Sequence, residues 1–200
     1  RLGLRALLDF FGVLLALGMI PFRSGPHPLR SAAATLVGIL YPPVLLSSVL
    51  YLRIGAGLAV GGADAFALTT LTLVLVWVAD IGAYYTGKSI GKRRLAPQIS
   101  PNKTWEGFFG GTAAALLTGA GAGAVGLVML GGLEVLGLAA ICAIASPIGD
   151  LLESRFKRSV QVKDAGSLLP GHGGIMDRID GLVFAVPIAV LYLRYMIGLW

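Results

Sequence analysis

Residues 65–86 read AFALTTLTLVLVWVADIGAYYT, and this stretch decides the fold class. It is long enough for a helix that crosses a lipid bilayer, which needs about 20 mainly apolar residues. The same stretch carries a carboxylate, Asp80, near its end. A charge close to the end of an apolar span needs a reason, because burying it in lipid costs several kcal/mol. We therefore expect a membrane-spanning helix with a functional group at one end.

Other stretches of the chain have a similar length and apolar character. Six spans are expected in total, at 4–22, 32–52, 65–86, 108–130, 133–152 and 181–199. Pro42-Pro43 predicts a kink in the second span, and Gly119 and Gly123 have the GxxxG spacing of packed membrane helices. We expect an all-α, polytopic integral membrane helix bundle that forms a single domain over residues 1–200.

Composition excludes most other classes of protein. The 200 residues are 56% hydrophobic and only 13% charged, and the mean hydropathy is +0.83. A soluble domain is about 25% charged, and disordered chains are polar and rich in charge. The single cysteine, Cys142, allows neither an intrachain disulfide nor a cysteine zinc site, and its apolar surroundings predict a buried residue. The chain begins at Arg1, so we expect a fragment or a processed chain with further helices upstream.

The positive charges follow a pattern along the chain. Three segments, 23–31, 87–107 and 153–180, hold twelve of the 16 Lys and Arg residues, and they alternate with turns near 53–64 and 131–134 that are poor in them. Six spans place the three rich segments on one side, which the positive-inside tendency identifies as the cytoplasm. The net charge of +6 therefore indicates a multi-pass protein of the cell membrane, not a nucleic-acid partner.

Polar residues form stripes where two of the spans end. Asp80, Tyr84 and Lys88 share one helical face. A second stripe, with Glu153 beside it, contains Ser146, Asp150, Ser154 and Lys157. The simpler alternatives are that Asp80 pairs with a nearby Lys and that Arg155 and Arg158 only anchor the helix at the membrane. Asp150 at a membrane boundary indicates function more strongly.

Two connecting segments carry further polar clusters. In KDAGSLLPGHGGIMDRIDG, 163–181, glycines around His172 let the backbone approach a ligand, and their amides can face phosphate oxygens. His172 can act as a base or simply hold the loop in shape. The second cluster is SPNKTWEG, 100–107. The simpler alternative to a functional role for Ser100 or Thr104 is that one of them caps the helix that follows.

The cytoplasmic rim therefore collects two kinds of charge. Carboxylate oxygens suit hard divalent cations, and the carboxylates are Asp80, Asp150, Asp177 and Asp180. Cationic side chains neutralise phosphates, and these are Lys88, Lys103, Lys157, Arg158, Lys163 and Arg178. Together they suit a polyanionic substrate with magnesium. Serine-hydrolase, zinc and Walker A motifs are absent from the sequence.

The stretch SRFKRSVQVKDAGSLLPGHGGIMDRID, 154–180, resembles the signature of the phosphatidate cytidylyltransferase family, the CDP-diacylglycerol synthases. Its fixed elements are Ser-x-x-Lys-Arg, Lys-Asp, His-Gly-Gly and Asp-Arg-x-Asp, and all of them are present. DIGAYYTGKSIGK at 80–92 and ISPNKTWEG at 99–107 are also similar to the family. Many members have Lys where this chain has Asn102, so no phosphate contact is assigned there. Residues 1–64 match only as apolar helices.

The resemblance implies that CTP and phosphatidic acid react to give CDP-diacylglycerol and pyrophosphate at the bilayer surface, with Mg²⁺ as the cofactor, as two divalent or mixed cations. It implies metal ligands at Asp150, Asp177 and Asp180. The implied catalytic groups are Asp150, Asp177, Lys157, Arg158, Lys163, Asp164, His172 and Arg178. The implied substrate-binding residues are Asp80, Ser100, Lys103, Thr104, Glu106, Ser154, Gly173 and Gly174. The glycine-rich spans also permit a homodimer.

Other functions fit parts of the pattern. An anion transporter usually carries polar residues near the bilayer midplane, whereas here they gather at one rim. A CDP-alcohol phosphotransferase would carry a DGxxAR pattern, which this chain lacks. A CTP-dependent lipid kinase stays open, and the reaction products would distinguish it. A degenerate scaffold would not need to retain these costly charges.

Overall fold

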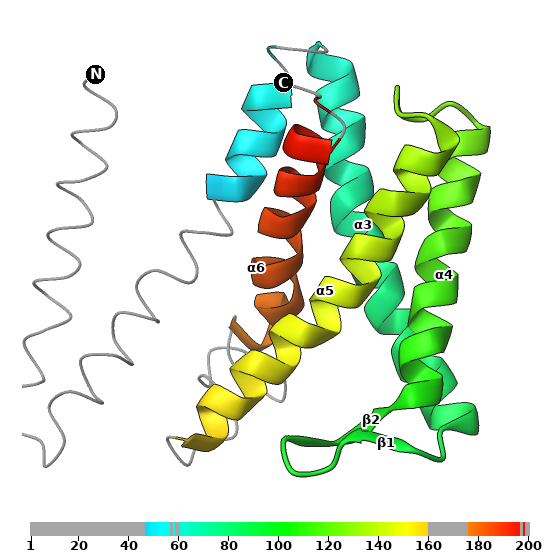
Figure 1. The fold of residues 1–200 in the computed structure, drawn as a ribbon, viewed down its shortest axis with the longest axis vertical. Helices are drawn as coiled ribbons and strands as arrows, with labels where there is room; N and C mark the ends of the chain where they lie inside the picture. The colour runs from blue at the N-terminus through cyan, green and yellow to red at the C-terminus, as the bar shows by residue number, and fades with distance from the viewer. Residues whose placement is uncertain (1–46, 57, 59–60, 160–175, 197, 199–200) are drawn as a thin grey trace, which may run out of the picture. The chain divides into compact units, whose positions relative to one another are not determined.

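A computed structural model describes residues 47–56, 58, 61–159, 176–196 and 198 (Figure 1). All of them belong to the second of two compact units, Arg1–Val44 and Leu45–Trp200. The expected span 4–22, most of 32–52 and the Pro42-Pro43 kink lie outside the described residues. The single-domain organisation therefore stays a prediction.

The described part of the chain is mostly helical, as the apolar spans predicted. Residues 47–56 form a helix, and the later elements are α3 (Gly62–Ile90), α4 (Trp105–Ala124), α5 (Gly132–Ser159), α6 (Met176–Leu191) and the π-helix η2 (Tyr192–Met196). The all-α expectation was incomplete, because β1 (Arg94–Ala96) and β2 (Ser100–Thr104) pair as an antiparallel hairpin between α3 and α4.

Two described stretches are long and apolar enough to cross a membrane, Gly62–Ile90 and Gly132–Arg158. In each, 44% of the apolar window is buried inside the protein, whereas the core helix of a soluble protein would be mostly buried. Outward-facing apolar residues on these helices include Phe66, Trp77 and Ile144. These helices indicate membrane association, and the count of six spans stays a prediction.

Glycines let α3 and α4 pack at close range. A Cβ added to Gly107 would lie 2.7 Å from the carbonyl oxygen of Ala83, and one added to Gly111 would collide with the carbonyl oxygen of Ala79. Because neither backbone oxygen can move aside cheaply, larger residues at these positions would push the two helices apart. The sequence WEGFFGG, 105–111, thus fixes the crossing of α3 and α4.

The other helix contacts also involve small residues. Gly119 of α4 faces Ala139 of α5, where an added Cβ would lie 2.9 Å from the alanine Cβ. This contact confirms the packing role expected of Gly119. Gly149 of α5 meets α6, because an added Cβ would lie 2.9 Å from the carbonyl oxygen of Asp180. Cys142 is a fully buried free thiol in α5, as expected.

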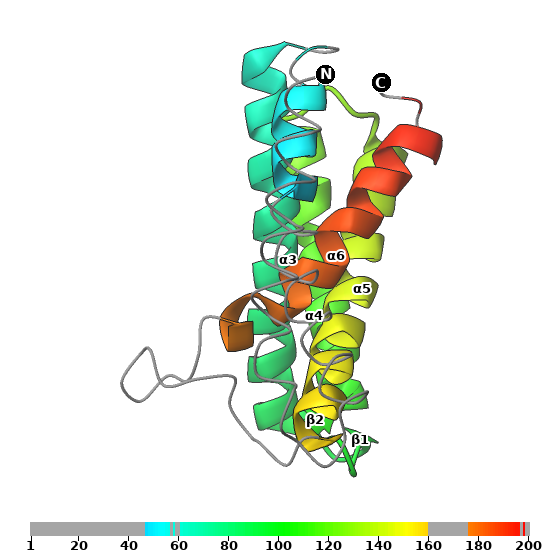
Figure 2. The same ribbon diagram turned by 90° about the vertical axis from the view of Figure 1, so that its left-hand side faces the viewer.

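The helices alternate in direction, so the connections gather at two ends. The hairpin, the start of α4 and the C-terminal end of α5 lie at one end, and the connection 125–131 lies at the other (Figure 2). This arrangement places the basic segment 87–107 and the basic end of α5 together, as the charge pattern predicted. The side of a membrane that this end faces stays a prediction.

Candidate active site

A pocket of about 660 Å³ lies where α3, α4, α5 and α6 meet the hairpin. Asp80, Tyr84 and Lys88 all line it, which confirms that these three residues share one face of α3. The other polar lining residues come from the hairpin and from α4, α5 and α6, and they are Arg94, Ser100, Asn102, Lys103, Thr104, Thr112, Asp150 and Asp180. Residues far apart in the sequence thus contribute charge to one cavity.

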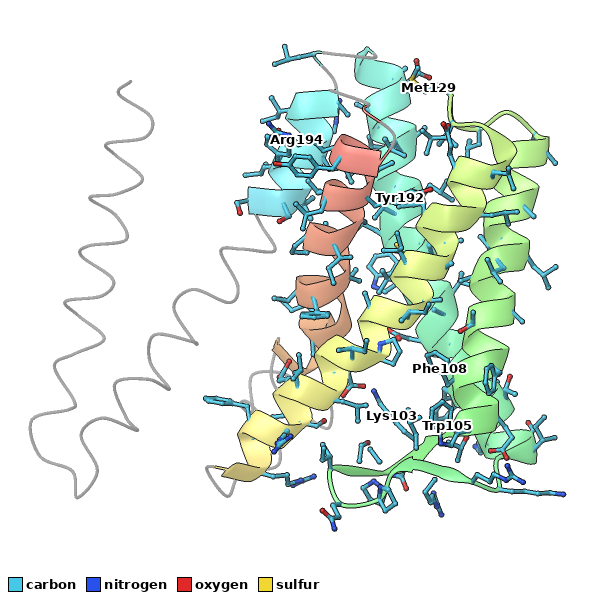
Figure 3. All side chains as sticks on the ribbon, in the orientation of Figure 1. Lys103, Trp105, Phe108, Met129, Tyr192 and Arg194 are labelled. Carbon is cyan, nitrogen blue, oxygen red and sulfur yellow. The ribbon has the colours of Figure 1, made fainter. Side chains whose placement is uncertain are left out.

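An ion pair crosses the pocket from the hairpin to α5. Lys103 Nζ contacts Asp150 Oδ2, and Figure 3 shows Lys103 reaching from β2 toward α5. Ser154 Oγ donates to Asp150 Oδ1 at 3.2 Å. The side chains of Lys103 and Asp150 are 24% and 33% exposed. A solute in the pocket can therefore reach both charges.

A second polar contact joins α3 to α5. Ser146 Oγ donates a hydrogen bond to Asp80 Oδ1 at 2.8 Å, and the Ser146 side chain is fully buried. The residues of the polar stripe on α5 therefore contact different parts of the protein. Ser146 holds Asp80, and Asp150 one turn later faces Lys103.

The last turn of α5 carries its own ion pair. Lys157 Nζ lies 3.4 Å from Glu153 Oε1 in an i, i+4 pair. Lys157 and Arg158 are not among the residues that line the pocket. The structure thus does not bring these two cations to Asp150 and Lys103, and their catalytic role stays a prediction.

Asp180 brings a third carboxylate to the pocket from α6. The backbone N–H of Gly181 donates to Asp180 Oδ1 at 2.7 Å. Gly181 packs against Ser146, where an added Cβ would collide with Ser146 Oγ. This close approach of α6 to α5 is what allows Asp180 to line the same cavity as Asp80 and Asp150.

The donor chemistry of the pocket suits a hard cation, because carboxylate oxygens are the ligands that Mg²⁺ prefers. Within the part of the chain that the structure describes, no cluster of three or more His, Cys, Asp or Glu side chains has the geometry of a metal site. Asp177 lies in the first turn of α6, but its side chain lies outside the description. The magnesium site stays a prediction.

The start of α4 shows that two expected substrate ligands have structural partners. Thr104 is the N-cap, and its Oγ1 accepts the backbone N–H of Gly107 at 3.1 Å, so the capping alternative holds. Thr104 also lines the pocket, whereas Glu106 does not. The Glu106 carboxylate accepts the backbone N–H groups of Lys92 at 3.0 Å and Arg93 at 3.2 Å. Its own backbone N–H and then that of Lys92 lower the pKa of Glu106 from the usual range of a glutamate.

Aromatic rings surround the same end of the bundle. Lys88 Nζ lies 5.7 Å from the centre of the Tyr84 ring, within the range of a cation–π contact. The ring centres of Trp105 and Phe108 are 6.0 Å apart at the start of α4 (Figure 3). Phe108 lines the pocket, and Trp105 and Phe109 are exposed. Exposed aromatic residues are typical of membrane–water interfaces.

Several predicted site residues lie outside the described residues, namely Lys163, Asp164, His172, Gly173 and Gly174. Asp177 and Arg178 lie in α6, but their side chains are not described. The roles of all these residues stay predictions.

Sequence reasoning missed part of the pocket wall. Arg94 lines the pocket, although it appeared in the sequence only as one of three consecutive basic residues. Phe108, Thr112, Ala143 and Pro147 form much of the remaining wall. These residue types are common in any apolar span, so no sequence pattern distinguished them.

These features define a helical, membrane-associated protein with a charged and accessible pocket at one end. The sequence model of the cytidylyltransferase family matches residues 2–196. The chain therefore belongs to the cytidylyltransferase family, which confirms the resemblance found in the motifs.

Individual relatives agree with this assignment. A phosphatidate cytidylyltransferase of Pseudomonas aeruginosa is 51% identical over 129 residues, which cover 60% of this chain and 45% of that protein. The enzyme of Brucella suis is 48% identical over 134 residues, covering 66% and 48%. The enzyme of Bacillus subtilis is 44% identical over 126 residues, covering 62% and 47%. The chain spans about half the length of the curated relatives it matches.

Proposed function

We propose that this chain carries the catalytic pocket of a phosphatidate cytidylyltransferase, which joins CTP and phosphatidic acid to give CDP-diacylglycerol and pyrophosphate. Family membership and the names of the relatives support this reaction. The observation that carries the proposal is the meeting of Lys103 with Asp150 in one accessible pocket at the end of apolar helices.

The reaction needs a site of this chemical kind. A phosphate oxygen of phosphatidic acid attacks the α-phosphorus of CTP in line, and the bond from that phosphorus to the departing pyrophosphate breaks. The attacking phosphomonoester is largely dianionic at pH 7, because its second pKa is about 6. A strong general base is therefore unnecessary. The barrier lies in bringing two anions together, and preorganised positive charge lowers it.

Three cationic side chains line the pocket and can supply that charge, Lys88, Arg94 and Lys103. Lys103 contacts Asp150, so an arriving phosphate competes with Asp150 for the ammonium group. Lys157, Arg158, Lys163 and Arg178 are proposed to add charge around the same end. Asp164 and His172 are proposed as further catalytic residues, and Gly173 and Gly174 as residues that bind the substrates.

Mg²⁺, as one or two cations, is proposed to be held by Asp150, Asp177 and Asp180. When bound, the metal would neutralise phosphate charge and align the reacting groups. Asp150 and Asp180 come from different helices and line one pocket, which supports this ligand set. Asp80, held by Ser146, is proposed to orient the substrates from the α3 side.

The pocket has a polar and an apolar part, which suits an amphiphilic substrate. The hairpin supplies Arg94, Ser100 and Lys103, whereas Phe108 of α4 and Ala143 and Pro147 of α5 supply apolar walls. A lipid headgroup would meet the cations at the hairpin, and the acyl chains would leave along the apolar helices. We further propose a multi-pass protein whose pocket faces the cytoplasm, where CTP is available.

The full-length protein in detergent micelles, given CTP labelled at its α-phosphate and phosphatidic acid, tests the proposal. Formation of CDP-lipid and pyrophosphate that requires Mg²⁺ is the expected result. Release of CDP with a phosphorylated lipid would instead identify a kinase. Absence of any product, combined with anion movement across sealed vesicles, would identify a transporter.

A further inference from the structure

A glutamate outside the pocket closes the base of the hairpin. Glu106 lies in the first turn of α4, and its carboxylate accepts the backbone N–H groups of Lys92 and Arg93, which follow the end of α3. The backbone N–H of Trp105 also donates to the carbonyl oxygen of Arg93 at 3.0 Å. These bonds join the residues just before β1 to those just after β2.

The hairpin needs such ties to hold its position. It contains two short strands, with Arg94 opposite Thr104 and Ala96 opposite Ser100. An isolated two-stranded hairpin is marginally stable at best in water. The backbone around it is already close-packed, because a Cβ on Gly87 would lie 2.9 Å from Thr104 Oγ1. The bonds to Glu106 are therefore among the contacts that tie the first hairpin strand to the start of α4.

The hairpin carries the cations that face the site. Arg94 lies two residues after Lys92, and Lys103 lies three residues before Glu106. Both cations line the pocket, and Lys103 contacts Asp150. A shift at the base of the hairpin would move Arg94 and Lys103 relative to α5.

We propose that Glu106 is a positioning residue, whose carboxylate fixes the hairpin so that Arg94 and Lys103 line the pocket and Lys103 contacts Asp150. The kinetic part of this inference rests on the proposed function. Two observations favour this role over a direct substrate contact. Glu106 does not line the pocket, and its carboxylate already accepts the backbone N–H groups of Lys92 and Arg93.

The test uses the full-length protein with the variants Glu106→Gln and Glu106→Ala. The amide of Gln offers one neutral acceptor in place of two charged oxygens, and Ala offers none, so the effects should be graded. Glu134→Gln is a matched control. Glu134 also lies in the first turn of its helix, and its carboxylate accepts the backbone N–H of Gly131 at 2.7 Å at the opposite end of the bundle.

Limited trypsin digestion measures the base of the hairpin directly, because trypsin cleaves after Lys92, Arg93 and Arg94, which lie just before β1 and at its first residue. We expect Glu106→Ala to raise the cleavage rate there about tenfold, since hydrogen bonds to charged groups are among the stronger ones. Glu106→Gln should show a smaller increase, and Glu134→Gln should match the wild type.

Steady-state kinetics measures the consequence for the site. We expect kcat/KM for CTP to fall about tenfold in Glu106→Ala and less in Glu106→Gln, with thermal stability close to that of the wild type. Faster cleavage together with this graded loss supports the positioning role.

Three outcomes would overturn it. Unchanged cleavage and unchanged kinetics would show that Glu106 does not hold the hairpin in position. Faster cleavage with unchanged kinetics would show that the hairpin position does not matter for the reaction. A kinetic loss with unchanged cleavage would indicate direct substrate contact. A wild-type protein that forms no CDP-lipid would refute the proposed function instead, and the cleavage rates would still decide whether Glu106 holds the hairpin.

Discussion

The positively charged side chains at the two ends of the helix bundle have different contact partners. At the hairpin end, Lys103 contacts the carboxylate of Asp150 beside a pocket. At the opposite end, the Arg194 guanidinium lies 5.7 Å from the centre of the Tyr51 ring and 5.5 Å from that of Tyr195 (Figure 3). Cations beside aromatic rings suit a membrane interface, whereas cations beside carboxylates in a cavity suit binding of an ionic ligand.

Both ends also have a glutamate in the first turn of a helix, but the two glutamates have different partners. Glu134 accepts the N–H of Gly131, three residues before it, whereas Glu106 accepts the N–H of Lys92, 14 residues before it. A carboxylate near a helix N-terminus is stabilising wherever it occurs. What distinguishes Glu106 is therefore its contact with another segment of the chain, and not its place in the helix.

The largest expected difference between the ends concerns Asp150. Asp150→Asn should lower turnover at least about 100-fold, because it removes the carboxylate that pairs with Lys103 and that is proposed to hold Mg²⁺. Arg194→Gln at the other end should stay within about twofold of the wild type, as most surface substitutions do. Turnover of both variants at equal Mg²⁺ provides the comparison. Equal activities would remove the distinction between the two ends.

Lys103 should show the next largest effect. Lys103→Gln should reduce turnover about tenfold to 100-fold, because a charged contact to phosphate is lost while Asp150 remains. Lys103→Arg should recover part of the activity, since the charge is kept and the geometry is changed. Rates at saturating CTP and phosphatidic acid measure both. Full activity of Lys103→Gln would exclude Lys103 as a phosphate ligand.

Packing within α4 should also differ between its two halves. Gly111→Ala should destabilise the protein by about 1–3 kcal/mol, the usual cost of overpacking, because the added methyl group collides with α3. Gly121→Ala is the matched control in the same helix, where no atom lies within 4 Å of the added Cβ. It should be neutral or slightly stabilising. Thermal unfolding in detergent distinguishes the two variants. Equal melting temperatures would contradict the role of Gly111 in the close crossing of α3 and α4.

The smallest expected effect concerns Ser146. Ser146→Ala removes the hydrogen bond to Asp80 and should lower kcat/KM about threefold to tenfold, in line with the about 0.5–1.5 kcal/mol that one hydrogen bond typically contributes. Cys142→Ala, a neighbouring buried substitution in α5, is a suitable control. Indistinguishable kcat/KM values for the two variants would show that Asp80 needs no partner on α5.

The helices were predictable from the sequence because long apolar stretches leave few alternatives. Their ends were less predictable. The predicted span 108–130 corresponds to α4, which starts at Trp105 because Thr104 caps it, and which ends at Ala124. Gly126, with φ +65, then takes the chain out of the helix. Because this part of the chain contains many glycines, the apolar pattern alone did not show at which of them the helix ends.

The site was predictable as a set of charges but not as a set of contacts. The stripes of α3 and α5 identified Asp80 and Asp150 because charges at the ends of apolar spans are costly. The hairpin was missed because its strands lack the alternation of apolar residues that predicts one. The bond from Ser146 to Asp80 joins residues 66 positions apart, and only the tertiary structure pairs them.

Protection of the pocket by CTP tests the central claim most directly. With the buried Cys142 replaced by Ala, Ser100→Cys places a thiol in the pocket wall, and Leu133→Cys places one at the opposite, exposed end. We expect saturating CTP with Mg²⁺ to slow maleimide labelling at position 100 about tenfold or more, since bound ligands bury most of their surface in such pockets. Labelling at position 133 should not change. Equal labelling rates at position 100 with and without CTP, in a protein that forms CDP-lipid, would contradict the placement of the nucleotide in this pocket.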